Sequence, residues 1–283
     1  MTRLAILTLQ SQVVYGHVGN SAAVFALQRV GREAWAAPTV LLSNHPGYGA
    51  TSGAPVAPAL VGEMIDGLDA LGALDRCDGV LTGYLPSAET GAAVLDAALR
   101  AQAKGAVWLC DPVFGDDGRI YARPGVKEFL RDAAIPRADL VTPNLFELET
   151  LTGVFVGDLA SARDAMAALR GRGPRAVVCT SFDRETPEGA LDVLALDGEG
   201  FWRARTARFE RRFEGAGDLF AALFLAAFLE TRRCAAALGR ACAGVAATLD
   251  ATQRAGAREL ALIGAQEAMA AGWRAGAAVE RLG

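Results

Sequence analysis

The chain has 283 residues, a formal net charge of −4, and 52% hydrophobic residues. This length and composition suit one large α/β domain with a sizeable core and exclude a globally disordered chain. The acidic balance argues against nucleic acid or an anionic membrane surface as a partner.

Cysteine use and the apolar runs indicate the compartment. The five cysteines are scattered and form no C-x-x-C pair, which predicts a reduced, cytoplasmic protein without structural zinc. The apolar run at residues 4–9 is interrupted at Gln10 and is predicted to be a first strand rather than a signal peptide. The run at residues 219–229 is too short for the roughly 20 residues that span a bilayer, so we predict a buried core helix.

Strand-like and helix-like patterns alternate along most of the chain. The patterns predict strands at residues 4–9, 34–42, 79–82, 106–110, 139–141 and 176–179, and an antiparallel pair at 191–196 and 201–206. They predict helices at residues 19–30, 58–74, 87–104, 124–131, 145–151 and 160–170, and an almost entirely helical remainder from 217 onward. This alternation predicts an α/β fold with a central, mostly parallel sheet flanked by helices on both faces, as a single domain over residues 1–283.

Polar residues recur directly after the predicted strands. They are Gln10-Ser11, Gly83-Tyr84, Asp111-Pro112, Thr142-Pro143-Asn144 and Thr180-Ser181. Ligands of open parallel sheets bind at the carboxyl ends of the strands. The five groups therefore predict a ligand site at one edge of the sheet.

A glycine turn, Gly215-Ala216-Gly217-Asp218, directly precedes the apolar run at residues 219–229. Such a turn exposes main-chain N–H groups at a helix N-terminus, where an anion such as a phosphate binds. Asp218 beside that anion is a candidate proton acceptor, although an acid is also favoured there by the helix dipole alone. The combination predicts phosphoryl transfer to an alcohol, with Asp218 as the base.

Several other polar residues have both a structural and a functional interpretation. Asn144 and Glu147 have the spacing of a capping box, and the same geometry could hold a hydrated Mg²⁺ ion. Asp111 either ends a strand or faces phosphates and their cation. The loop at residues 115–123 is a candidate lid in which Asp116 is a solvated acid or a neighbour of the cation. The basic cluster is a solvated strand face or a nucleotide contact, and it consists of Arg203, Arg205, Arg208, Arg211 and Arg212.

The known motifs of other nucleotide enzymes are missing. The sequence has no G-x-x-x-x-G-K-[ST] loop, no protein-kinase H-R-D or D-F-G set and no G-x-S-x-G elbow. Both histidines, His17 and His45, lie in polar turns rich in glycine, which favours contact with a small polar substrate over a histidine-rich metal site.

Taken together, the motifs of this chain resemble those of the pyridoxal kinases of the ribokinase-like superfamily. The resemblance runs from residue 4 to about residue 255 and rests on residues 15–23, 43–45, 83–85, 111–113, 142–144, 146–149, 151–153, 180–181 and 215–220. It implies transfer of the γ-phosphoryl group of ATP to the 5′-hydroxyl group of pyridoxal, pyridoxine or pyridoxamine. It also implies Mg²⁺, a monovalent cation (K⁺ or Na⁺) and a homodimer.

The resemblance also implies roles for individual residues. Asp218 would be the base, and Gly215, Ala216 and Gly217 would line the anion hole. The substrate pocket would include Ser11, Val18, His45, Pro46, Gly47 and Tyr84. ATP would be contacted by Asp111, Tyr121, Thr142, Asn144, Glu147, Thr180, Ser181, Arg211, Arg212, Phe213 and Glu214. The metal would be surrounded by Asp111, Asp116, Thr142, Asn144 and Glu147.

Two positions depart from the family pattern. Pro46 stands where the family commonly has threonine, which removes a hydroxyl and an N–H donor. Ala216 stands where the usual turn has threonine, and it keeps its main-chain N–H group. The Pro46 departure leaves a kinase of a related ring alcohol, such as hydroxymethylpyrimidine, as an alternative. A catalytically weak pyridoxal phosphate-binding protein of the same fold is the other.

Overall fold

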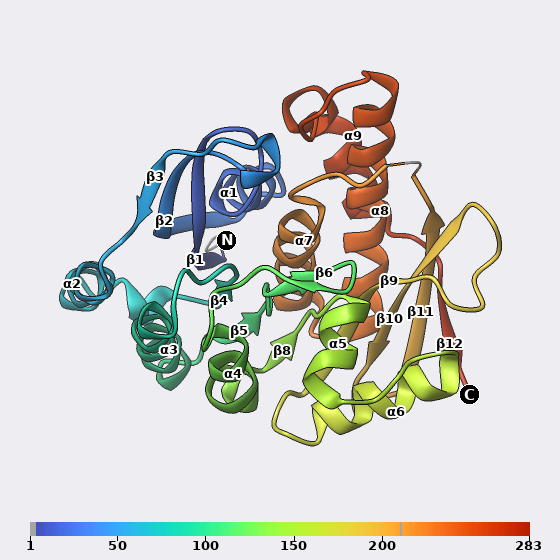
Figure 1. Ribbon diagram of the computed structural model, residues 1–283, viewed down its shortest axis with the longest axis horizontal. Helices are drawn as coiled ribbons and strands as arrows, with labels where there is room; N and C mark the ends of the chain where they lie inside the picture. The colour runs from blue at the N-terminus through green and yellow to red at the C-terminus, as the bar shows by residue number, and fades with distance from the viewer. Residues whose placement is uncertain (1–3, 210) are drawn as a thin grey trace.

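The computed structural model describes residues 4–209 and 211–283, and in this part of the chain ten strands form one sheet (Figure 1). In spatial order they are β12 (Val279–Leu282), β11 (Phe201–Ala207), β10 (Ala190–Leu196), β9 (Ala176–Phe182), β8 (Leu140–Val141), β5 (Val107–Cys110), β4 (Gly79–Thr82), β1 (Ala5–Tyr15), β2 (Glu33–Asn44) and β3 (Gly53–Pro55). The strands from β9 to β2 pair in parallel, whereas β10 to β12 at one end and β3 at the other pair antiparallel. The predicted mostly parallel sheet is confirmed.

Helices cover both faces of the sheet, as the alternation predicts. The α-helices are α1 (Asn20–Arg29), α2 (Pro58–Ala70), α3 (Ala88–Ala103), α4 (Val126–Phe129), α5 (Leu145–Thr152), α6 (Leu159–Arg170), α7 (Ala216–Thr231), α8 (Cys234–Arg254) and α9 (Leu262–Ala275). Buried residues of α1, α7, α8 and α9 belong to one core cluster, and those of α2 to α6 belong to the other. The strands supply both cores, because successive side chains point to opposite faces.

Strand β1 shows how this alternation works. Ile6 packs into the core under α7, while Leu7 and Leu9 pack into the core under α2 and α3. All three side chains are fully buried. Since a strand covered on both faces needs apolar residues at every position, the central strands read as continuous apolar runs.

Helix α7 is the central helix of one layer, and every residue from Leu219 to Leu229 is buried. This confirms the predicted core helix. Helix α8 is long and apolar enough to cross a membrane by length and composition alone. In the structure it packs against α7, α9 and strands β10 and β11, as a core helix does.

Several features differ from the predictions. Strand β1 continues to Tyr15 through a register shift between Gln10 and Ser11, so these two residues lie within the strand rather than after it. Thr180 and Ser181 likewise lie inside β9. The carboxyl-terminal part is not wholly helical, because β12 pairs with β11. Within the candidate lid, β6 (Gly115–Asp116) and β7 (Arg119–Ile120) form a short separate hairpin.

Candidate active site

The glycine turn begins α7 and places Asp218 in its first helical turn. Gly215 is the N-cap with φ of 83°, and a Cβ atom at this position would lie 1.9 Å from the carbonyl oxygen of His17. Only glycine combines this left-handed backbone with so close an approach. The turn is therefore fixed against the loop that contains His17.

The first turn of α7 offers open main-chain donors. The N–H group of Ala216 donates to the carbonyl oxygen of Phe213 at 3.3 Å. Among the described residues, no acceptor is found for the N–H groups of Gly217 and Asp218. A Cβ atom at Gly217 would meet no atom within 4 Å. The helix N-terminus is thus open at Gly217 and Asp218, and an anion bound there would accept hydrogen bonds from their N–H groups.

The carboxylate of Asp218 is held by the first loop of the chain. Its Oδ2 atom accepts a hydrogen bond of 2.8 Å from the main-chain N–H group of Gly19. Loss of hydration raises the pKa of Asp218, and the negative charge of Glu214 adds to this, while Gly19 and the positive charge of His45 act in the opposite direction. A carboxylate with a raised pKa is the stronger proton acceptor, which suits a general base.

Gly19 brings Ser11 close to Asp218. It is the N-cap of α1 with φ of 55°, and a Cβ atom there would lie 2.3 Å from both the carbonyl oxygen and the Oγ atom of Ser11. Ser11 and Val18, the residue before Gly19, are both buried. The structure thus brings together the base and two predicted substrate contacts from segments about 200 residues apart.

A second loop faces the glycine turn from the other side. His45 caps a short 3₁₀ helix, η1 (Pro46–Tyr48), and its Nδ1 atom accepts from the N–H group of Gly47 at 3.1 Å. The Nε2 atom of His45 lies 3.7 Å from Oε2 of Glu214. Pro46 occupies the first helical position, where its fixed φ is favourable and its missing N–H group is not needed. The departure at Pro46 is therefore compatible with the local fold.

Tyr84 and Gly83 follow β4, as predicted. The carbonyl oxygen of Tyr84 accepts from Oγ1 of Thr39 at 2.9 Å, which ties this strand end to β2. A Cβ atom at Gly83 would lie 2.5 Å from Oε1 of Gln10. The end of β4 therefore lies beside the register shift in β1 and the middle of β2.

Asp111 is a buried acid at the end of β5. Its Oδ1 atom accepts from Oγ1 of Thr142 at 2.7 Å, so the ends of β5 and β8 are joined as predicted. Burial, and then the negative charge of Asp218, raises the pKa of Asp111 to about 7. Asp111 thus lies at the carboxyl end of β5, at the edge of the sheet where the site was predicted.

Asn144 and Glu147 form the capping box at the start of α5. The N–H group of Glu147 donates to Oδ1 of Asn144 at 2.8 Å, and that of Asn144 donates to Oε2 of Glu147 at 2.9 Å. The Oε1 atom of Glu147 also accepts from the N–H group of Phe114 at 3.0 Å. Burial, and then the charge of Asp111, raises the pKa of Glu147 well above its usual range. The capping box is therefore present, and it holds a buried carboxyl group at the start of α5.

The candidate lid is tied to the site on two sides. Asn144 donates from Nδ2 to the carbonyl oxygen of Gly115 at 2.8 Å. Arg212 forms ion pairs with Asp116 and Asp117 at 2.5 and 2.6 Å. Asp116 thus already has a protein cation as its partner.

Tyr121 lies at the end of this lid and is about half exposed. Loss of hydration, and then the charges of four surrounding carboxylates, raises the pKa of its hydroxyl group. These acids are Glu147, Asp111, Asp116 and Asp218. The main-chain N–H group of Tyr121 donates to the carbonyl oxygen of Phe114 at 3.0 Å, and the N–H group of Phe114 donates to Glu147, so Tyr121 lies near the site.

The remaining nucleotide candidates lie on β9 and on the segment before the glycine turn. Thr180 donates from its main-chain N–H group to the carbonyl oxygen of Pro143 at 2.9 Å, and Ser181 has φ of 60°. Phe213 is buried, with the guanidinium carbon of Arg211 at 4.7 Å from its ring centroid.

The basic cluster predicted from the sequence divides into three parts. Arg203 and Arg205 pair with the buried Asp192 on β10, which lies beside Phe182 at the carboxyl end of β9. Arg208 pairs with Asp183, the residue that follows β9, at 3.4 Å. Arg211 and Arg212 lie before the glycine turn instead.

The acids at this edge fit a cation that binds with the nucleotide. The carboxylates of Asp111 and Glu147 are buried, and in the described residues neither has a lysine or arginine within salt-bridge distance. No group of three or more His, Cys, Asp or Glu side chains with metal-ligand geometry occurs in that part of the chain. Two buried carboxyl groups without a protein cation suit Mg²⁺, which keeps several waters and takes few protein ligands.

Sequence reasoning missed one group of residues beside the acceptor loops. Glu259 accepts from the main-chain N–H group of His17 at 2.8 Å and is also hydrogen-bonded to the hydroxyl group of Tyr48. Arg258 stacks on the Tyr48 ring at 3.6 Å. No motif or strand end marks Arg258 and Glu259 in the sequence.

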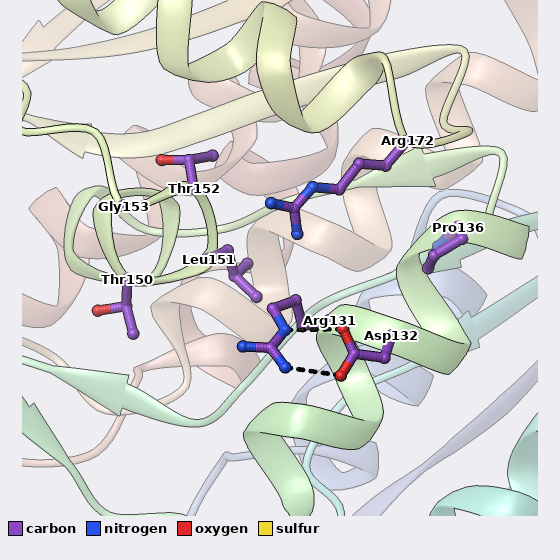
Figure 2. Close-up of a pocket in the computed structure, with 8 residues that line it drawn as sticks. All are labelled: Arg131, Asp132, Pro136, Thr150, Leu151, Thr152, Gly153 and Arg172. Carbon is purple, nitrogen blue, oxygen red and sulfur yellow. Dashed lines mark hydrogen bonds and ion pairs between the residues drawn. The ribbon is translucent and has the colours of Figure 1, made fainter.

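A depression of about 760 Å³ lies at the opposite edge of the sheet (Figure 2). It is lined by Pro136 and Arg172, which precede β8 and β9, and by the end of α5 at Gly153. Arg131 in this depression is already paired with Asp132 at 2.7 Å. Ligands of such sheets bind at the other edge, and none of the predicted site residues lines this depression.

Comparison with known proteins places the chain in one family. Residues 19–262 match the family model described as phosphomethylpyrimidine kinase. The pyridoxal kinase of Deinococcus radiodurans is 46% identical over 271 residues, which cover 92% of this chain and 91% of that protein. The pyridoxal kinase of Rubrobacter xylanophilus is 45% identical, with 95% and 94% covered. The structure of Leishmania donovani pyridoxal kinase in complex with ADP and pyridoxine superposes with a TM-score of 0.89 at 33% identity, covering 99% of each chain.

Proposed function

The chain belongs to the pyridoxal kinase family, and we infer that it transfers the γ-phosphoryl group of ATP to the 5′-hydroxyl group of pyridoxal. The observation that carries this function is the meeting of Asp218, the open N-terminus of α7 and the loops that contain Ser11 and His45. A base, an anion site and an acceptor pocket are what phosphoryl transfer to an alcohol requires.

The family resemblance decides between the alternatives. The family model is named for a pyrimidine kinase, but relatives with 38% to 46% identity over more than nine-tenths of this chain are pyridoxal kinases. This does not favour hydroxymethylpyrimidine as the substrate. A pure binding protein needs no base, so the held carboxylate of Asp218 argues against a carrier.

The proposed mechanism assigns the proton and the charge to residues of this chain. Asp218 takes the proton of the 5′-hydroxyl group as the hydroxyl oxygen bonds to the γ-phosphorus. The bond between the γ-phosphorus and the oxygen that bridges it to the β-phosphate breaks, and ADP leaves with its electron pair. The main-chain N–H groups of Gly217 and Asp218 stabilise the negative charge on the phosphoryl oxygens. Gly19 holds one oxygen of Asp218 so that the carboxylate has a fixed direction.

We propose Asp111 and Glu147 as the residues that hold Mg²⁺, in part through its waters, and the capping-box position of Glu147 supports a water-mediated contact. The ion would neutralise charge on the phosphates of ATP. Asn144 and Thr142 would keep these acids in place. The dependence on K⁺ or Na⁺ is a proposal from the resemblance, and activity in each salt against tetramethylammonium tests it.

A homodimer in the cytoplasm completes the proposal. Two exposed apolar side chains on the β1–β2 extension, Val14 and Leu41, support self-association. The five buried, free cysteines support a reducing compartment. Light scattering of the purified chain tests the oligomer.

The function is tested by incubation of the purified chain with ATP, Mg²⁺ and one alcohol at a time. The panel is pyridoxal, pyridoxine, pyridoxamine and hydroxymethylpyrimidine. We expect ADP release with pyridoxal and the appearance of its 5′-phosphate. ADP release only with the pyrimidine would overturn the assignment, and binding of pyridoxal without ADP would favour the carrier.

A further inference from the structure

The connection between α8 and α9 contacts both loops of the acceptor pocket. One carboxylate, that of Glu259, accepts with Oε2 from the main-chain N–H group of His17 at 2.8 Å and with Oε1 from the hydroxyl group of Tyr48. His17 belongs to the loop that ends in Gly19, the residue bonded to Asp218. Tyr48 ends the loop that begins with His45. A single side chain therefore joins the two segments that face the base.

The neighbours of Glu259 strengthen the same junction. The guanidinium group of Arg258 stacks on the Tyr48 ring at 3.6 Å and donates to the carbonyl oxygen of Gly47 at 2.7 Å. The carbonyl oxygen of Ala257 accepts from the guanidinium group of Arg211. The residues 257–259 thus contact the acceptor loops and the segment before the glycine turn.

This junction is anchored to the core rather than free. Thr252 in α8 is buried and accepts two hydrogen bonds from this segment. Its hydroxyl group accepts from the N–H group of Ala261 at 2.9 Å, and its main-chain carbonyl oxygen accepts from the N–H group of Ala257 at 3.2 Å. Leu260 is buried and would lie 3.3 Å from a Cβ atom at Gly215. Because the segment is bonded to α8 on both sides of Glu259, this side chain holds the two loops at a fixed position relative to α8.

The close approach to Gly16 indicates that the fit is specific. A Cβ atom at Gly16, where φ is 100°, would lie 2.5 Å from Oε2 of Glu259. The loop therefore has room for the carboxylate only because residue 16 has no side chain. Two hydrogen bonds from different loops to one ionised carboxylate are also stronger than neutral bonds.

We propose that Glu259 is a positioning residue for the phosphoryl acceptor: it sets the distance between the His17 and Tyr48 loops and so orients the ring alcohol toward Asp218. The inference rests on the proposed kinase function. Glu259 has no contact with ATP in this proposal, so its removal should weaken the binding of pyridoxal and leave the binding of ATP unchanged. A residue that only stabilised the fold would change the melting temperature, but its removal would not raise KM for pyridoxal more than KM for ATP.

The test is the variant Glu259→Gln. Glutamine has the same shape but no charge: its carbonyl oxygen can accept from the N–H group of His17, and its NH₂ group can only donate to the Tyr48 hydroxyl group. The charge-assisted bonds to the two loops are therefore replaced by weaker neutral bonds. We expect KM for pyridoxal to rise about tenfold, with KM for ATP within about twofold of wild type. Glu267→Gln is the matched control, since Glu267 lies on the exposed surface of α9 in an ion pair with Arg29.

A second variant keeps the test decisive if Glu259→Gln folds poorly. Tyr48→Phe removes only the hydroxyl group and should raise KM for pyridoxal by about threefold, and its effect should be smaller in the Glu259→Gln background. Full additivity of the two changes would contradict the shared junction. An active wild type with unchanged KM for pyridoxal in both variants would overturn the inference, whereas an inactive wild type would instead overturn the proposed function.

Discussion

The main-chain N–H group of Gly19 donates a hydrogen bond of 2.8 Å to Oδ2 of Asp218, and this bond connects the starts of two helices, α1 and α7. It fixes the direction of the carboxylate with a donor that carries no side chain. Among the described residues no bond to Oδ1 of Asp218 is found. That oxygen is therefore the one left for the hydroxyl group of the acceptor.

Removal of the base should abolish turnover while the fold persists. Asp218→Asn keeps an oxygen that can accept from Gly19 but cannot take a proton, so we expect kcat to fall by about 10³-fold. ADP release with pyridoxal measures this, and circular dichroism melting measures the fold. Asp250→Asn, in an exposed ion pair with Arg254, is the control and should keep wild-type turnover. Wild-type turnover in Asp218→Asn would refute its role.

Gly19 should not tolerate even one added methyl group. In Gly19→Ala the new Cβ atom would lie 2.3 Å from two atoms of Ser11, on a backbone with positive φ. We expect a loss of about 1–3 kcal/mol in the free energy of unfolding and a fall in kcat, because the loop must move away from Asp218. The matched control is Gly31→Ala, where φ is also positive (81°) but no atom lies within 4 Å. Urea unfolding of both variants isolates the contact with Ser11 from the backbone term.

Much of this arrangement could be predicted from local patterns. The helix after Ser87 and the strand at Gly79–Thr82 have the predicted bounds to within one residue, because cap residues and continuous apolar runs mark them in the sequence. Strand β12 could not be predicted, since its residues alternate weakly and gain order only by pairing with β11. The extension of β1 past Gln10 was missed for a similar reason, as its polar residues are stabilised by β2.

The site shows the same division. Asp111 and Thr142 could be placed together because the ends of adjacent parallel strands meet. Glu259 could not, since its partner His17 lies 242 residues away and neither side chain forms part of a pattern. Contacts of this kind depend on how complete elements pack, which no local spacing encodes.

The pH dependence of kcat/KM should show the raised pKa of Asp218. The base must be deprotonated, so activity falls as the pH falls through its pKa, and this acid limb should lie above the usual range of an aspartate. When protonated, His45 lowers this pKa, so His45→Gln should move the limb to higher pH. Glu214→Gln removes a negative charge that raises it and should move the limb to lower pH. Shifts in the same direction for both variants would contradict the assignment of Asp218 to that limb.

Asp111 should reduce the stability of the metal-free protein as the pH rises. Its pKa is raised to about 7 in the folded protein, whereas an unfolded aspartate titrates near pH 4. The unfolded chain therefore binds fewer protons between these values, and the free energy of unfolding falls with rising pH across that window. Asp111→Asn has no such titration and can still accept from Thr142, so it should be more stable than wild type above pH 7, by at most about 4 kcal/mol.

Urea unfolding in the presence of a chelator, at pH 5 and at pH 8, checks this difference. The stability gain of Asp111→Asn should be about a third as large at pH 5 as at pH 8, where it is near its maximum. Addition of Mg²⁺ and ATP at pH 8 should reduce the gain, because the cation then compensates the charge in wild type alone. The same substitution should lower kcat, since the charge that destabilises the empty protein is the one proposed to hold the ion. A gain that is equal at both pH values would show that Asp111 titrates as an ordinary surface acid, and its place beside the phosphates would have to be abandoned.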